Sequence, residues 1–212
     1  MRTRPRTRSA VRAVAAALLI AAATAQATTQ AQAQPREEVP QPGLIATTDL
    51  PPDSLTWQVS SIGPGWKDDA PCLWNWAGPA VSEDRLFTAN FMTSETAAAT
   101  ENVIVLPTEA EAVATLDSVR QYLAGCADRT RASSPTSVVT GYDHGTVDVE
   151  EGATVGGVHL QKVPAWEGYR NFLYGVGRDG NTVAIVEWES NWTQPDVPAF
   201  KETVRAAVNK LY

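Results

Sequence analysis

The stretch YRNFLYGVGRDGNTVAIVEWES, residues 169–190, predicts the centre of the fold. Its two halves are rich in β-branched and aromatic residues, and a short polar connection separates them. Asp179-Gly180 in the middle of that connection favours a two-residue type I′ turn, so we expect a β-hairpin. Counting back from this turn gives the expected pairs: Arg178 with Asn181, Val176 with Val183, and Tyr174 with Ile185.

The two faces of this hairpin differ in chemistry. Small or smooth apolar side chains, onto which a helix can pack closely, occupy one face: Leu173, Gly175, Ala184 and Val186. Aromatic and charged side chains occupy the other: Arg170, Phe172, Tyr174, Ile185, Glu187 and Glu189. Because each buried charge needs compensation, we expect this mixed face to be open.

An open face with aromatic area and polar groups has what a binding surface needs. We therefore predict a cleft lined by Arg170, Tyr174 and Glu187, with Trp166 or Trp192 at its rim. The alternative is a solvated sheet face held together by an ion pair between Arg170 and Glu189.

The rest of the chain adds strands and two helices. The five further strand candidates are residues 56–62, 85–93, 102–106, 136–142 and 155–163. Thr108 and Glu111 are spaced as a capping box, and they open a helix whose apolar stripe reaches Cys126. Asp196 and Pro198 start the second helix. The predicted fold class is α+β: an antiparallel sheet with two α-helices packed on one face.

The N-terminus is typical of an export signal. Residues 1–12 are basic, residues 13–25 are uncharged, and small-x-small cleavage sites follow. We expect a signal peptide at 1–33, a disordered leader at 34–43 and one domain at 44–212. An uncharged run this short cannot span a bilayer, so the mature chain is expected to be secreted and to lack a membrane span.

The charge excludes one class of partner. The formal net charge is −7, but from residue 34 onward 12 basic residues face 24 acidic ones. Such an acidic domain is unsuited to nucleic acid, whose phosphates need a surplus of Lys and Arg. We expect a monomer without a cofactor or metal. The acidic stretch 143–151 could offer oxygen ligands to Ca²⁺, but acidic runs are usually solvated turns.

Two cysteines in an exported chain indicate one disulfide. A Cys72–Cys126 bridge would tie the irregular, Trp-rich stretch around Cys72 to the end of the first predicted helix. The alternative is a catalytic thiol, which needs a neighbouring base, and His144 and His159 are the chain's two histidines.

The order of these features resembles a known family. It comprises Asp49-Leu50-Pro51, a Cys in an irregular segment, a strand-Pro-helix unit over 103–126, the strand 183–188 and Pro198-Ala199-Phe200. This order is similar to the PknH-type extracellular sensor domain of actinobacteria, over residues 44–212. The resemblance implies an α+β sheet with a ligand-holding cleft. Kinase-linked members carry more than one disulfide and a membrane segment, which this chain lacks.

Three functions follow as hypotheses. The first is a secreted, non-enzymatic domain that binds a ligand or partner at the bacterial cell envelope, where the ligand is a glycan, a lipid or a peptide. The second is an envelope glycan hydrolase that uses Glu187 and Glu189, since two carboxylates two residues apart share one strand face. The third is a structural secreted protein with no small-molecule ligand.

Overall fold

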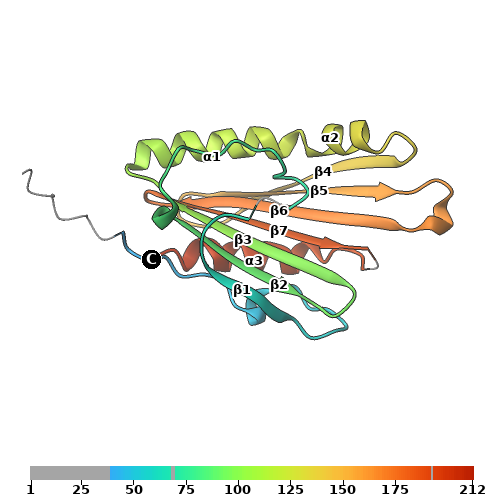
Figure 1. The fold of residues 1–212 in the computed structure, drawn as a ribbon, viewed down its shortest axis with the longest axis horizontal. Coiled ribbons are helices and arrows are strands. Elements are labelled where there is room, and N and C mark those ends of the chain that lie inside the picture. Colours follow the sequence, from blue (N-terminus) through green and yellow to red (C-terminus); the bar gives the residue numbers. More distant parts are fainter. Residues whose placement is uncertain (1–38, 68–69, 192) are drawn as a thin grey trace, which may run out of the picture. The chain divides into compact units, whose positions relative to one another are not determined.

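The computed structural model of the protein describes residues 39–67, 70–191 and 193–212. A seven-stranded sheet in this part of the chain has the order β1-β2-β3-β7-β6-β5-β4, and each neighbouring pair is antiparallel (Figure 1). The strands are β1 Gln58–Pro64, β2 Leu86–Met92, β3 Ala97–Val105, β4 Val138–Val147, β5 Ala153–Gln161, β6 Tyr169–Asp179 and β7 Thr182–Ser190. The predicted antiparallel sheet of an α+β fold is therefore confirmed.

The helices lie on both faces of this sheet. The α-helices of the described residues are α1 Glu109–Ala124, α2 Cys126–Ser133 and α3 Val197–Asn209. Val183 and Ile185 share one apolar core with α1, whereas Ala184 and Val186 share a second core with α3. Figure 1 shows α1 and α2 together along one side of the sheet and α3 apart from them. The prediction that both helices pack on one face is wrong, because successive apolar residues in a central strand need cover on both faces.

The hairpin faces are covered unequally. On the face of small residues, Gly175 lets α3 approach so closely that a Cβ at this position would overlap Val204. On the mixed face, Phe172, Ile185 and Glu187 are buried. The expectation that this face is open is therefore wrong over much of its length, because α1 packs on it.

The turn of the hairpin differs from the prediction by one residue. Asp179 pairs with Thr182, so Gly180 and Asn181 are the two central residues. Gly180 has φ +53°, which suits the first position of a type II′ turn. The Asn181 amide donates to the Leu106 carbonyl oxygen at 2.6 Å and fixes this register. Pairs therefore shift by two positions, which keeps every side chain on its predicted face.

The globular unit begins earlier than predicted. Residues 39–43 were expected to belong to a disordered leader, but Pro42 is buried and Val39 packs against the core of α3. The predicted signal peptide, 1–33, and residues 34–38 lie outside the described residues. In the part of the chain that is described, no helix is long and apolar enough to cross a membrane.

The predicted capping box at the start of α1 is confirmed. The Glu111 N–H donates to the Thr108 hydroxyl at 3.2 Å, and the Thr108 N–H donates to the Glu111 carboxylate at 3.1 Å. The apolar stripe of this helix is buried, as its spacing predicts: Ala112, Leu116, Val119 and Leu123. Cys126 begins α2 rather than ending α1, with Gly125 between the two helices.

Replacing Thr108 with alanine is expected to lower the free energy of unfolding by about 1 kcal/mol. The change removes the hydroxyl that accepts the Glu111 N–H and donates to the Glu111 carboxylate at the start of the helix. Urea unfolding of Thr108→Ala measures the loss. The matched control is Thr136→Ala, at an exposed position outside the helices. Equal stabilities of the two variants would contradict a stabilising cap.

Candidate functional site

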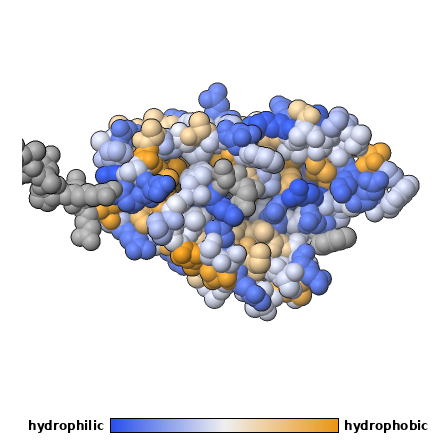
Figure 2. Space-filling view, viewed as in Figure 1, coloured by the Kyte–Doolittle hydropathy of each residue, from blue (hydrophilic) through white to orange (hydrophobic). Residues whose placement is uncertain are grey.

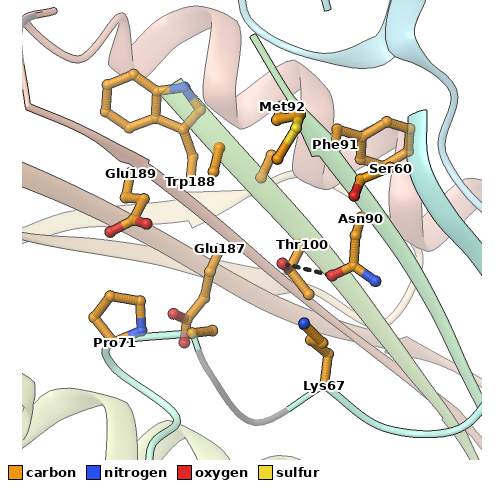
Figure 3. A pocket seen from close by; sticks show the side chains of 13 residues that line it. Ser60, Lys67, Pro71, Asn90, Phe91, Met92, Thr100, Glu187, Trp188 and Glu189 are labelled. Atoms are coloured by element: carbon orange, nitrogen blue, oxygen red, sulfur yellow. Dashed lines mark hydrogen bonds between the residues drawn. The ribbon is translucent and has the colours of Figure 1, made fainter. Parts of the chain in front are cut away.

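A polar cleft lies on the α1 face of the sheet, beside the region that the helices cover. On this face α1 contacts β5, β6 and β7, while α2 contacts β4 and β5. Over β1, β2 and β3 the same face is approached by the described parts of the segment before and after Cys72, residues 66–67 and 70–76. The hollow between segment and sheet has a volume of about 140 Å³ (Figure 3). Its polar lining residues are Ser60, Lys67, Asn90, Thr100, Glu187 and Glu189.

The floor of the cleft is a row of polar side chains across three strands. Asn90 of β2 pairs with Thr100 of β3, which pairs with Glu187 of β7. The Thr100 hydroxyl donates to the Asn90 amide oxygen at 3.1 Å (Figure 3). The Asn90 amide donates to the Ser61 hydroxyl at 2.9 Å. These bonds fix the orientation of the amide, so the floor offers donors and acceptors in fixed positions.

The segment above the floor is anchored to the sheet at both ends of the cleft. The Asn102 side chain accepts from the Lys67 N–H at 3.0 Å and donates to the Lys67 carbonyl at 2.9 Å. The Cys72 N–H donates to the Glu187 carboxylate at 3.3 Å, and the Arg129 guanidinium donates to the Cys72 carbonyl at 2.9 Å. Each anchor joins residues far apart in sequence, so the cleft exists only in the folded chain.

The predicted disulfide forms a further anchor of this segment. Cys72 and Cys126 are bonded, with their Cα atoms 5.2 Å apart. Both residues are buried in the core beneath α1. The alternative of a catalytic thiol is therefore wrong, since the described residues include no free cysteine.

Two carboxylates of β7 line the cleft, and they differ in burial and in their partners. Glu187 is buried and accepts the Cys72 N–H, whereas Glu189 is half-buried and forms an ion pair with Arg170 at 2.6 Å. The Arg170 guanidinium also lies 5.0 Å from the centre of the Phe172 ring. The ion pair that the sequence offered as the simpler alternative is thus present.

The residues predicted for the site do not meet in one cleft. Glu187 lines the polar cleft, Tyr174 lines a separate hollow beneath α1 and α2, and Arg170 lines a third one near Tyr169. Trp166, in the connection between β5 and β6, is 86% exposed and lines none of these three hollows. Trp192 lies outside the described residues.

Asn90, Thr100, Asn102 and Lys67 are site residues that the sequence prediction missed. A signal for the first was available, because the alternation in 85–93 places Asn90 and Thr88 on the face opposite Phe87. The predicted strand 102–106 began five residues too late, since β3 begins at Ala97. That error left Thr100 outside the predicted sheet.

The acidic stretch 143–151 is divided between β4 and the turn that follows it. Residues up to Val147 belong to β4, and Glu151 forms an ion pair with Arg178 at 2.6 Å. Across the described ranges, no group of three or more His, Cys, Asp or Glu side chains is placed to hold a metal ion.

The surface on this side carries no single apolar face. Figure 2 shows hydrophilic groups over much of the view, with apolar groups in several separate patches.

A comparison with protein-family models gives no match, and neither does a comparison with curated protein sequences. The resemblance to the PknH-type sensor domain stays a prediction that rests on the residues quoted for it.

Proposed function

We propose that this protein is a secreted, non-enzymatic domain that binds a ligand at the bacterial cell envelope. The observation that carries the proposal is the polar cleft, where the row Asn90-Thr100-Glu187 forms the floor beneath an anchored segment. Fixed polar groups beside an anchored segment are suited to binding, because little conformational freedom is lost when a ligand arrives.

The chemistry of the lining favours a hydroxyl-rich ligand, and we infer a glycan. Amide, hydroxyl and carboxylate groups line the floor, and the side chains of Met92 and Pro71 offer apolar contact (Figure 3). Sugar hydroxyls can both donate to Glu187 and Glu189 and accept from Asn90. A lipid chain is disfavoured by the small volume and polar floor of this cleft.

Export is part of the proposal, and two observations support it. A buried disulfide suits an oxidising compartment outside the cytoplasm. The basic, then apolar, then small-x-small order of the first 33 residues is typical of a cleaved signal.

The hydrolase alternative needs one carboxyl group that gives a proton and a second that acts as base or nucleophile. Glu189 forms an ion pair with Arg170, and Glu187 accepts a backbone N–H that anchors the segment. Both carboxylates thus have partners with a structural role. We therefore propose binding without turnover.

Substitutions in the floor are expected to weaken glycan binding about tenfold, the effect of losing one good hydrogen bond of about 1.4 kcal/mol. The variants are Asn90→Ala and Thr100→Val, and Thr140→Val on the edge strand β4 is the matched control. Titration of oligosaccharides released from bacterial envelope polymers, followed by chemical shifts, measures the affinity. Product analysis of the same mixtures tests for hydrolysis.

Two outcomes would contradict the proposal. If both floor variants remain folded and bind the oligosaccharides as tightly as the wild type does, the polar cleft is not the site. If the wild type cleaves them and Glu187→Gln does not, the protein is a hydrolase.

A further inference from the structure

A second cleft lies between the helices and the far half of the sheet, beneath α1 and α2 and above β4, β5 and β6. Its volume is about 450 Å³, within the range that small-molecule sites occupy. It is separate from the polar cleft, and none of the proposed glycan contacts line it. Binding of a ligand in this second cleft would therefore be independent of the proposed function.

Small residues give this cleft its shape. The Tyr174 ring lies flat across Gly156, where an added Cβ would come within 2.5 Å of the ring. Gly141 of β4 lets α2 approach, since a Cβ there would lie 2.8 Å from the Ala127 side chain. Larger side chains at these positions would have to displace Tyr174 or the helix. The apolar side chains of Leu123 on α1 and Val176 on β6 also line the cleft.

Arg120 of α1 brings a positive charge into the cleft. Among the described residues, it forms no ion pair with a carboxylate, whereas Arg178 has Glu109 and Glu151. The Arg120 Nε is buried and has no hydrogen-bond partner in that part of the chain, and its terminal nitrogen reaches the Gly152 carbonyl at 3.5 Å. Burying a guanidinium costs free energy unless an anion or several acceptors compensate it.

The electrostatic surroundings of Arg120 also favour an anionic group beside it. Burial and the neighbouring Arg178 lower the pKa of Arg120, and Asp117 opposes them. An anionic group beside Arg120 would offset both unfavourable effects. Arg suits such a group because its planar fork matches two carboxylate oxygens.

The remaining polar groups restrict the ligand further. Thr154 and Tyr174 line the cleft, and neither hydroxyl takes part in a hydrogen bond among the described residues. Asp143 lines the cleft too, and it raises the pKa of Tyr174 in addition to the larger effect of burial. Its negative charge disfavours a second anionic group on the ligand. A phosphate dianion would lack charge balance here, because one guanidinium would face two negative charges in addition to Asp143.

We propose that this cleft binds a small monocarboxylate with an apolar or aromatic body. The carboxylate pairs with Arg120, the body packs on Leu123, Val176 and the Tyr174 ring, and the hydroxyls of Thr154 and Tyr174 hydrogen-bond to its polar substituents.

Three probes test the class of ligand: 2-naphthoate, the neutral 2-naphthamide of matched size, and inorganic phosphate as a small anion without an apolar body. Titrations of the full secreted chain, followed by chemical shifts of the residues around Arg120, give each affinity. We expect 2-naphthoate to bind at least tenfold more tightly than the other two. Equal binding of the amide would mean that apolar contact alone acts, and equal binding of phosphate would mean a general anion site; either result overturns the proposal.

Two substitutions test the place of binding. Arg120→Met keeps the apolar stem and removes the charge, and Ala124→Phe fills the cleft while Arg120 stays. We expect each to weaken 2-naphthoate binding at least tenfold, and the matched control Arg205→Met, on α3 at the opposite face of the sheet, to leave it unchanged.

A structural role for Arg120 would have a different signature. If Arg120 serves a ligand, the ligand-free Arg120→Met protein should melt at or above the wild-type temperature, because a positive charge that burial and Arg178 disfavour is gone. A lower melting temperature together with unchanged 2-naphthoate binding would show that Arg120 only supports the fold.

Discussion

Removal of the Cys72–Cys126 disulfide is expected to lower the free energy of unfolding by about 4 kcal/mol, because the bridge closes a long loop. The two cysteines are 54 residues apart in sequence, so their bond removes much of the freedom of the unfolded chain. Both side chains are fully buried, at 0% and 1% exposure, which adds packing on the α1 side of the sheet. The double variant Cys72→Ala/Cys126→Ala, compared with the oxidised wild type in urea, measures the loss.

The native structure should survive this change at low denaturant. Asn102, Glu187 and Arg129 still hold the segment around Cys72 through hydrogen bonds. A reducing agent should bring the wild type to the stability of the double variant, and it should leave the variant itself unaffected. Thiols that titrate in the native oxidised protein, or an unchanged urea midpoint, would argue against the bridge as a stabilising element.

Local sequence patterns predicted the elements of this fold well. The capping box at Thr108 and the apolar stripe ending near Leu123 placed α1, because neighbours on one helix determine both signals. The turn residues between β6 and β7 predicted that these two strands pair, although the turn lies one residue further along and each predicted residue pair shifts by two positions. The disulfide followed from cysteine number and the predicted export, which are properties of the whole chain.

Relations between distant elements were harder to predict. Two amphipathic helices can pack on the same or on opposite faces of a sheet without any change in their own patterns. The apolar run 183–186 contained the deciding signal, since a strand that is apolar at successive positions is buried on both faces. The turn register depends on a bond from Asn181 to Leu106, a residue 75 positions away, which no local pattern reveals.

In the candidate site, too, local patterns were predictive and relations between distant elements were not. Glu187 was predicted from its face of the hairpin, and it does line the polar cleft. Arg170 and Tyr174 share that face, yet each of them lines a different hollow. A face defined by alternation states which side of a sheet a residue occupies, whereas a cleft depends on what covers that side.

A second large effect is expected at Glu101 of β3, a carboxyl group buried on the α3 side of the sheet. Glu101 is fully buried; one oxygen accepts the Ile45 N–H at 2.7 Å, and the other has no hydrogen-bond partner among the described residues. Burial raises its pKa to about 8; the Ile45 N–H and Lys210 lower it, and Asp49 raises it slightly. The folded state therefore keeps a neutral carboxyl group at neutral pH.

The sign of the pH effect follows from this raised pKa. In the unfolded chain the group ionises near its ordinary value of 4.5, so between pH 4.5 and 8 the folded state holds a proton that the unfolded state has lost. The contribution of Glu101 is thus fully present below pH 4.5 and is lost as the pH rises to 8. At about 1.4 kcal/mol per pH unit, the wild type should lose up to about 5 kcal/mol through this group.

Glu101→Gln isolates this contribution, because glutamine keeps the shape and the acceptor for Ile45 but cannot ionise. In urea unfolding from pH 4 to 9, we expect the variant to resemble the wild type at pH 4 and to be several kcal/mol more stable at pH 9. Other titrating groups are shared by both proteins, so the difference between their stability curves reports Glu101 alone. Glu150→Gln, at an exposed position, should follow the wild-type curve throughout. Parallel curves for Glu101→Gln and the wild type would mean that the buried carboxyl group is already ionised in the folded state, with Lys210 near enough to balance its charge.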